Sequence, residues 1–489
     1  MLLFFVSPAR ANDLEKQVRK VTLENGLTAL LIKREGAPIF SAHVRVKVGN
    51  IEEPKGSSGL AHFFEHMAFK GTPEIGVRDY PAEEKILAEM HAVGTELAQR
   101  RRKGESEEEL EPLAEKLHAL EEKDQTLLVK NEFVQIYQRN GGDDVNATTS
   151  NDFTNYYVSL PASKMELWAH LESERLLRPV LREFYKERDV VAEERRMRYD
   201  NDPDGKLYEA FLSTAFDANP YPSGTVSPYG VNVIGIPSDI RNYTFEAAMD
   251  FRRKYYIPSR MVVTVAGNFD VDTAERLVRE YFGKLPKKAD TPLAFEPQKP
   301  DGSFPREKVI TGRDEPRFYV GFHRPAFPHP DDEIFDVLEN LLCDGRTSRL
   351  FSLLVSQKKL VSEVDCYATL PGARLDSLFA FYAVPLKSAD SRVVRKEILD
   401  QVDLLKREPV KPEELEKVKN KISASLIWSL KENMGLASML GYFESLTGDW
   451  KYIYRLQKRI GEIAPADVQR AAQTYFVPGR EVTVYLEKE

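Results

Sequence analysis

The chain has 489 residues, of which 42% are hydrophobic and 30% are charged, and its formal net charge is −8. This composition excludes a disordered, collagen-like or low-complexity protein, and the length corresponds to about three domains of ordinary size, or to two large or four small ones. The basic excess that accompanies nucleic-acid binding is absent, and no stretch approaches the ~18 apolar residues of a membrane span. We therefore expect neither a nucleic-acid partner nor a membrane-spanning segment.

The first residues resemble the end of a secretory signal. An apolar run, Leu2–Val6, is followed by Ser7-Pro8 and then by small residues around Arg10. We therefore treat residues 1–17 as a signal-like segment and expect an exported protein. A charged start is missing and the apolar run is short, so an apolar tail on a cytoplasmic protein is the alternative.

The chain contains two cysteines, Cys343 and Cys366. Two thiols exclude both a scaffold of several disulfides and a four-cysteine zinc site. The sequence leaves open whether they pair, and we favour two unpaired thiols in a core.

The predicted elements alternate between strands and helices. An Asn25-Gly26 turn predicts a hairpin over 21–33, and alternating polar and apolar residues over 40–48 predict a half-buried strand. Ser58 is a candidate cap for a helix over 60–69. Further helices are expected at 82–97, 163–177, 183–199, 244–255, 271–282, 331–342, 391–406 and 412–431, and further strands within 145–160 and at 261–266, 317–323, 375–384 and 482–486.

An internal repeat indicates a duplicated architecture. The segment Tyr255–Val262 matches Tyr475–Val482 in a pattern of Tyr, two apolar residues, Pro, a small residue, Arg, any residue and Val. Both copies follow an amphipathic helix and precede a strand. Residues rich in Pro, Lys and Asp separate the two copies, and a dense run of charges at 99–124 is typical of a solvated helical insertion. We therefore expect an α+β protein with an N-terminal domain at 18–283, a linker at 284–308 and a homologous C-terminal domain at 309–489.

The segment His62-Phe63-Phe64-Glu65-His66 carries the clearest chemical signal. Histidines four residues apart lie on one face of a helix, so both rings can bind one metal ion. Glu65 lies close to that face and suits the general base that removes a proton from a metal-bound water. This is the inverted zinc motif, H-x-x-E-H.

A catalytic zinc ion needs a third protein ligand. The helix predicted at 183–199 carries Glu187 and Glu194, which are seven residues apart and share a face. One of them could bind the metal while the other orients a histidine, and the residues alone do not decide which.

Three segments together resemble the insulinase/pitrilysin family of zinc peptidases, most closely its bacterial and mitochondrial-processing-peptidase branch. They are Gly59–Thr72, which resembles the active-site helix, Val145–Ser150, which resembles the substrate-binding edge strand, and Glu187–Glu194, which resembles the third-ligand helix. The resemblance covers the chain from about Val18 onward and implies two homologous domains, each a mainly antiparallel sheet covered by helices, that form half of a clamshell-like chamber. It also implies that residues 99–124 are an insertion.

The resemblance implies a zinc-dependent endopeptidase acting on extended peptides or small unfolded polypeptides. His62, His66 and Glu194 would then bind one Zn²⁺, Glu187 would support a ligand, and Glu65 would act as general base. The peptide would add as a strand along 145–150, with Asn146 and the backbone of Ala147 holding it. If this is a bacterial member and it is exported, its location is periplasmic or secreted. Without export it would be cytoplasmic.

The sequence departs from this family in its second half. Self-sufficient members carry an Arg and, seven residues later, a Tyr that stabilise the oxyanion. Val355 and Ser362 occupy these positions here, and neither Tyr367 nor Arg374 is in register to replace them. We therefore expect a heterodimer with a homologous subunit that lacks zinc and supplies the pair, in preference to a homodimer. The alternative is a non-catalytic structural subunit, a role that other members of the family have.

Overall fold

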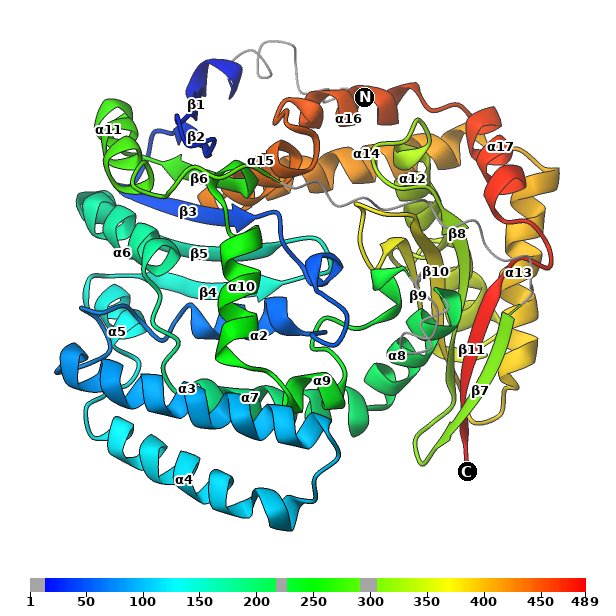
Figure 1. Cartoon of the computed structure of the whole chain (residues 1–489). Helices are drawn as coiled ribbons and strands as arrows, with labels where there is room; N and C mark the ends of the chain where they lie inside the picture. The colour runs from blue at the N-terminus through cyan, green and yellow to red at the C-terminus, as the bar shows by residue number, and fades with distance from the viewer. Residues whose placement is uncertain (1–13, 217–226, 291–305) are drawn as a thin grey trace. The chain divides into compact units, whose positions relative to one another are not determined.

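The computed structural model describes residues 14–216, 227–290 and 306–489 (Figure 1). The signal-like segment 1–17 and the linker 284–308 therefore lie largely outside the described residues. The chain divides into two compact units. Unit 1 contains the described residues of 14–195, 233–290 and 430–450, and unit 2 contains those of 196–232, 306–429 and 451–489.

Unit 1 is built on a six-stranded sheet in the order β1-β2-β6-β3-β5-β4. The strands are β1 (Val18–Thr22), β2 (Thr28–Lys33), β3 (Ile39–Val46), β4 (Asp143–Thr149), β5 (Thr154–Pro161) and β6 (Met261–Gly267). Only the β2–β6 pair is parallel, and the Asn25-Gly26 turn joins β1 to β2 as the sequence predicts. Among the described strands, β4 pairs with β5 alone and is an edge of this sheet.

Unit 2 has a five-stranded sheet in the order β7-β11-β8-β10-β9. Its strands are β7 (Arg306–Gly312), β8 (Arg317–Arg324), β9 (Val361–Leu370), β10 (Ser377–Pro385) and β11 (Val482–Lys488). This order repeats β2-β6-β3-β5-β4 of unit 1, including the single parallel pair, here β7–β11. The two repeated octapeptides occupy equivalent places, each leading from a helix into β6 or β11, so the duplication read from the sequence extends to the topology.

Helices cover the sheet of unit 1 on both faces. The helices are α2 (Leu60–Met67), α3 (Tyr80–Arg102), α4 (Glu107–Gln125), α5 (Glu132–Arg139), α6 (Met165–Leu177), α7 (Phe184–Arg195), α9 (Pro237–Arg241), α10 (Phe245–Tyr255), α11 (Val271–Phe282) and α15 (Asn433–Thr447), with short helices η1 (Asn50–Glu52), η2 (Ala162–Lys164) and η5 (Pro258–Arg260). On one face Phe40 of β3 meets Trp168 of α6. On the other, α15 packs on β3 and β6, and His43 and Arg45 contact its side chains. The prediction of a half-buried strand over 40–48 is therefore wrong, because a helix from a distant part of the chain covers its polar face.

The helices of unit 2 cover both faces of its sheet: on one face they surround a hydrophobic core, and on the other Phe211 stacks on Tyr319 of the sheet. They are α8 (Pro203–Ala215), α12 (Asp332–Leu342), α13 (Ser391–Arg407), α14 (Pro412–Ser429), α16 (Tyr452–Glu462) and α17 (Pro465–Tyr475), with the short elements η3 (Arg196–Asp200), η4 (Pro228–Gly230) and η6 (Phe351–Gln357). Within this core, Cys343 after α12 and Cys366 of β9 form a disulfide with a Cα–Cα distance of 5.5 Å. The expectation of two unpaired thiols is therefore wrong, because the fold places the end of α12 against β9.

Replacing both Cys343 and Cys366 with serine is expected to lower the free energy of unfolding of the oxidised protein by about 3 kcal/mol, because the disulfide closes a loop of 23 residues. Urea unfolding would measure this difference. The reductant dithiothreitol should bring the wild type close to the variant and leave the variant unchanged. A wild type insensitive to dithiothreitol would contradict the expectation.

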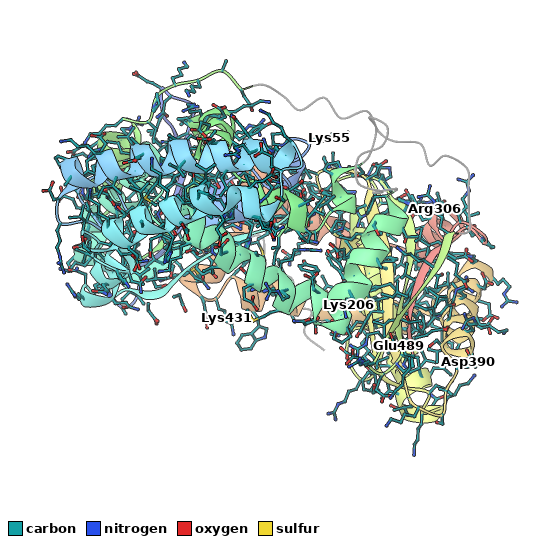
Figure 2. The ribbon with its side chains drawn as sticks, turned by 60° about the horizontal axis from the view of Figure 1, so that its bottom comes forward. Lys55, Lys206, Arg306, Asp390, Lys431 and Glu489 are labelled. Carbon is teal, nitrogen blue, oxygen red and sulfur yellow. A yellow bond between two sulfur atoms is a disulfide. The ribbon has the colours of Figure 1, made fainter. Side chains whose placement is uncertain are left out.

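The charged segment 99–124 is helical, as the sequence predicts. It spans the end of α3 and most of α4, which lie side by side in both views (Figures 1 and 2). Leu110, Leu117 and Leu120 of α4 are buried, while its glutamates remain mostly exposed. A search of the described residues finds no helix long and apolar enough to cross a membrane.

Candidate metal centre and active site

Helix α2 carries the H-x-x-E-H motif and is anchored at its N-terminus by carboxylates. Glu53 accepts hydrogen bonds from the backbone N–H groups of Gly59 (2.7 Å) and Ala61 (2.8 Å). Gly59 is the N-cap at φ 86°, and a Cβ there would lie 1.9 Å from the carbonyl oxygen of Ile234. Ser58 therefore does not cap α2 as predicted; its hydroxyl instead donates to Asp239. A glycine is required where the chain turns in a left-handed conformation against a neighbouring backbone.

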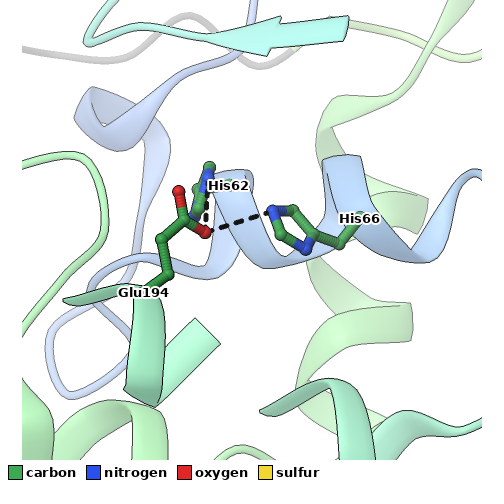
Figure 3. A group of neighbouring side chains, drawn as sticks. All are labelled: His62, His66 and Glu194. Atoms are coloured by element: carbon green, nitrogen blue, oxygen red, sulfur yellow. Dashed lines mark ion pairs between the residues drawn. The ribbon is translucent and has the colours of Figure 1, made fainter. Parts of the chain in front are cut away.

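Three side chains converge beside α2, as Figure 3 shows: His62 and His66 from the helix and Glu194 from α7. One ligand atom from each lies within 4.8 Å of the others. The Glu194 Oε2 atom is 3.8 Å from His62 Nε2 and 3.5 Å from His66 Nε2. Two tetrahedral zinc ligands, each about 2.1 Å from the ion, lie roughly 3.4 Å apart. The donor types and their spacing therefore fit a zinc site with three protein ligands.

Glu187 lies behind this cluster and contacts one of its histidines. Its Oε1 is 2.8 Å from Nδ1 of His66, and its Oε2 is 2.6 Å from Nζ of Lys70. Burial raises the pKa of Glu187, but the hydrogen bond with His66 and the charge of Lys70 outweigh it and lower the pKa to about 2. Burial lowers the pKa of His66, and Glu187 more than offsets this so that the pKa is raised. If the ionised Glu187 accepts a hydrogen bond from Nδ1 of His66, the proton of the neutral ring is on Nδ1. The lone pair of Nε2, which faces Glu194, is then available for a metal ion.

Replacing Glu187 with glutamine is expected to weaken zinc binding about 10- to 100-fold, the usual cost of removing a partner that orients a metal-binding histidine. Competition with a chromophoric chelator would measure the dissociation constant. Asp189→Asn on the same helix is the matched control, since the Asp189 side chain is 76% exposed and should leave zinc affinity unchanged. Equal zinc affinity in E187Q and the wild type would contradict the expectation.

Glu65 is buried on α2, between the two histidines in sequence. Its Oε2 accepts a hydrogen bond of 2.5 Å from the hydroxyl of Thr149 in β4. Neither Thr149 nor Lys70 was singled out from the sequence, although each had a signal. Lys70 follows His66 by one helical turn, and Thr149 is two residues from Ala147 and hence on the same face of its strand.

The two residues expected to hold substrate lie on the edge strand β4. Asn146 is exposed, and its Oδ1 accepts a hydrogen bond of 2.8 Å from the backbone N–H of Ala147. That amide therefore points away from the partner strand β5, and the side chain of Asn146 covers it. A peptide pairing with this edge must displace the side chain of Asn146 from the amide of Ala147.

Val355 and Ser362 of unit 2 occupy the positions where an Arg and a Tyr would stabilise the oxyanion. Val355 lies in η6 and packs against the hydrophobic core. The hydroxyl of Ser362 in β9 donates to the carbonyl oxygen of Val384 at 3.2 Å. The ring of Tyr367, one of the residues considered as a substitute, lies 6.3 Å from that of Tyr319 and is tilted by 42° to it.

Comparisons with known proteins show which family the chain resembles. A family model described as Insulinase (Peptidase family M16) matches residues 28–99 and 118–229, and one described as Peptidase M16 inactive domain matches 242–422. Residues 100–117, which the first model leaves unmatched, lie within the charged segment 99–124. The chain is 28% identical to the zinc protease PqqE of Helicobacter pylori over 476 residues, which cover 96% of this chain and 92% of that protein.

Two further similarities extend over nearly the whole chain. A crystal structure of a protease from Helicobacter pylori matches with a TM-score of 0.79 at 27% identity, covering 96% of this chain and 99% of that one. A Schizosaccharomyces pombe protein named "Probable mitochondrial-processing peptidase subunit beta" is 23% identical over 474 residues, which cover 92% of this chain and 87% of that protein.

Proposed function

Because the chain belongs to the insulinase family of peptidases, peptidase family M16, we propose that it is a zinc-dependent endopeptidase. The observation that carries this proposal is the convergence of His62, His66 and Glu194 beside Glu65. The substrates proposed are extended peptides or small unfolded polypeptides.

His62, His66 and Glu194 would hold one zinc ion. When bound, the ion would polarise the scissile carbonyl of the peptide and lower the pKa of a water molecule. Glu187 keeps His66 in the tautomer that offers Nε2. Glu65 takes the proton of the attacking water and later returns it to the leaving amine. The anchoring of α2 at its N-terminus keeps these side chains in a fixed relation.

The free edge of β4 supports extended peptides as the substrate class. A peptide that adds to this edge would receive main-chain hydrogen bonds from the strand that also carries Ala147 and Thr149. An unfolded segment has its backbone N–H and C=O groups available for such pairing, whereas most of those in a folded protein are already paired.

The second candidate function is that of a non-catalytic structural subunit. The match of residues 242–422 to a model described as an inactive domain favours it for that part of the chain. The presence of all three metal-binding side chains, His62, His66 and Glu194, favours catalysis. One zinc ion per chain by elemental analysis supports the peptidase, and a chain that binds no zinc would support the structural role.

We further propose that the protein works as a heterodimer and is exported to the periplasm or secreted. Val355 and Ser362 support the first part, since neither offers a charged donor for an oxyanion. The disulfide between Cys343 and Cys366 supports the second, because disulfides persist mainly outside the reducing cytoplasm. Cell fractionation of the producing organism tests the location.

The experiment that tests the activity is hydrolysis of an internally quenched peptide by the zinc-loaded chain, alone and with a homologous subunit added. Turnover that disappears with a chelator and returns with zinc supports the peptidase. Zinc binding without turnover in either condition would contradict it.

A further inference from the structure

The hydroxyl of Thr149 joins the edge strand β4 to the proposed general base. Thr149 is the last residue of β4, and its Oγ1 donates to Oε2 of Glu65 at 2.5 Å. Glu65 is 9% exposed, so this hydrogen bond lies in a largely desolvated place. Hydrogen bonds to an ionised group are stronger and shorter than those between neutral groups.

The backbone next to Thr149 is held by its own hairpin turn and by the turn at Gly49. The β4–β5 hairpin is closed by the N–H of Ser150, which donates to the carbonyl oxygen of Phe153 at 2.8 Å. The turn at Gly49 lies directly against this loop, since a Cβ at Gly49 would be 2.3 Å from the carbonyl oxygen of Asn151. Thr149 therefore extends from a framework with little freedom to move.

Helix α2 is also held by contacts outside this hairpin. Its N-terminus is bound by Glu53, and Phe64, next to Glu65, packs against Tyr256 with ring centroids 4.6 Å apart. The hydrogen bond between Thr149 and Glu65 joins these two elements directly beside the histidines. A carboxylate held in this way loses the freedom to rotate, which is what preorganisation for proton transfer requires.

We propose that Thr149 is a positioning residue for Glu65. Its hydroxyl fixes Oε2, so that the proton of the attacking water passes to Oε1 and from there to the leaving amine. This inference rests on the proposed peptidase function. Because β4 is also the strand on which the peptide is proposed to pair, Thr149 places the base in register with the bound peptide.

The test compares Thr149→Val, which keeps the shape and removes the hydroxyl, with Thr149→Ser, which keeps the hydroxyl. In the zinc-loaded protein, T149V is expected to lower kcat about 10- to 100-fold with little change in KM, and T149S to restore most of it. Thr95→Val is the matched control, because Thr95 makes a similar hydrogen bond of 2.6 Å to Glu246 away from the site. It should leave kcat unchanged.

A second measurement does not require turnover. A peptide hydroxamate binds zinc and gives its proton to a neighbouring carboxylate, so its affinity reports on the placement of Glu65. T149V is expected to weaken hydroxamate binding about tenfold, and to have no further effect in a chain that already carries Glu65→Gln. Zinc content should stay the same in all variants.

Three results would overturn the inference: T149V binding hydroxamate as the wild type does, T149V and T149S being equally impaired, or T149V acting just as strongly in the E65Q background. Failure of the proposed function has a different signature. In that case the wild type itself binds neither zinc nor hydroxamate, and the inference falls with it.

Discussion

Replacing Glu65 with glutamine is expected to lower peptide hydrolysis by about 10²–10⁴-fold while zinc stays bound. General acid–base catalysis contributes rate factors of this size, and glutamine keeps the volume of the side chain but cannot take a proton. The charge of Glu65 acts on His66, but Glu65 is not one of the three converging ligands, His62, His66 and Glu194. The measurement is the rate with a quenched peptide, in the assembly that shows turnover, beside the zinc content of each sample.

Two variants separate loss of the base from loss of the metal. Glu166→Gln makes the same chemical change on α6, where Glu166 accepts a hydrogen bond from Tyr281 near the surface, and should leave the rate unchanged. His62→Ala should lose both turnover and zinc, because it removes a ligand. An E65Q protein that retains a tenth of the wild-type rate, or that loses its zinc, would show that Glu65 does not have the proposed role.

The parts of the site that could be predicted from sequence are those set by helical spacing. His62, Glu65 and His66 lie within two turns of one helix, so their proximity follows from local geometry alone. Glu187 and Glu194 share a face of α7 for the same reason. Both contact the histidines, but which of them meets the Nε2 atoms depends on how α7 packs on α2. Only the family resemblance distinguished their roles before the structure was known.

Interactions between distant segments could not be predicted in this way. Ser58 is a favourable N-cap residue, yet Gly59 caps α2 because the backbone passes close to Ile234. Nothing local indicates that α15 packs on β3 and buries its polar face. Pairing of Cys343 with Cys366 likewise depends on the end of α12 meeting β9.

The two edge strands β4 and β9 gave a weak signal. β4 was identified as a strand. The sequence of polar and apolar residues along it does not reveal that Thr149 forms a hydrogen bond with Glu65 of α2. β9, which occupies the equivalent edge in unit 2, was not predicted at all. Its sequence mixes charged and apolar residues without a clear period, as expected where only one neighbour pairs with a strand.

Adding a homologous subunit that carries the Arg and Tyr is expected to raise hydrolysis by this chain about 10²–10³-fold. Loss of a single oxyanion donor costs roughly 2.7–4 kcal/mol in other hydrolases, which corresponds to a rate factor of that size. This chain offers valine at 355, packed in a core, and a serine at 362 that donates to a backbone carbonyl. The measurement is kcat/KM for a quenched peptide, with the two chains purified separately and then mixed.

The controls show which chain supplies the general base and which chain supplies the oxyanion donors. Mixing the added subunit with E65Q should give no activation, because the base belongs to this chain. A version of the added subunit with alanine in place of its arginine should bind this chain and activate it far less. If this chain alone hydrolyses the peptide as fast as the mixture does, the oxyanion is stabilised by groups other than those at 355 and 362, and the heterodimer proposal is wrong.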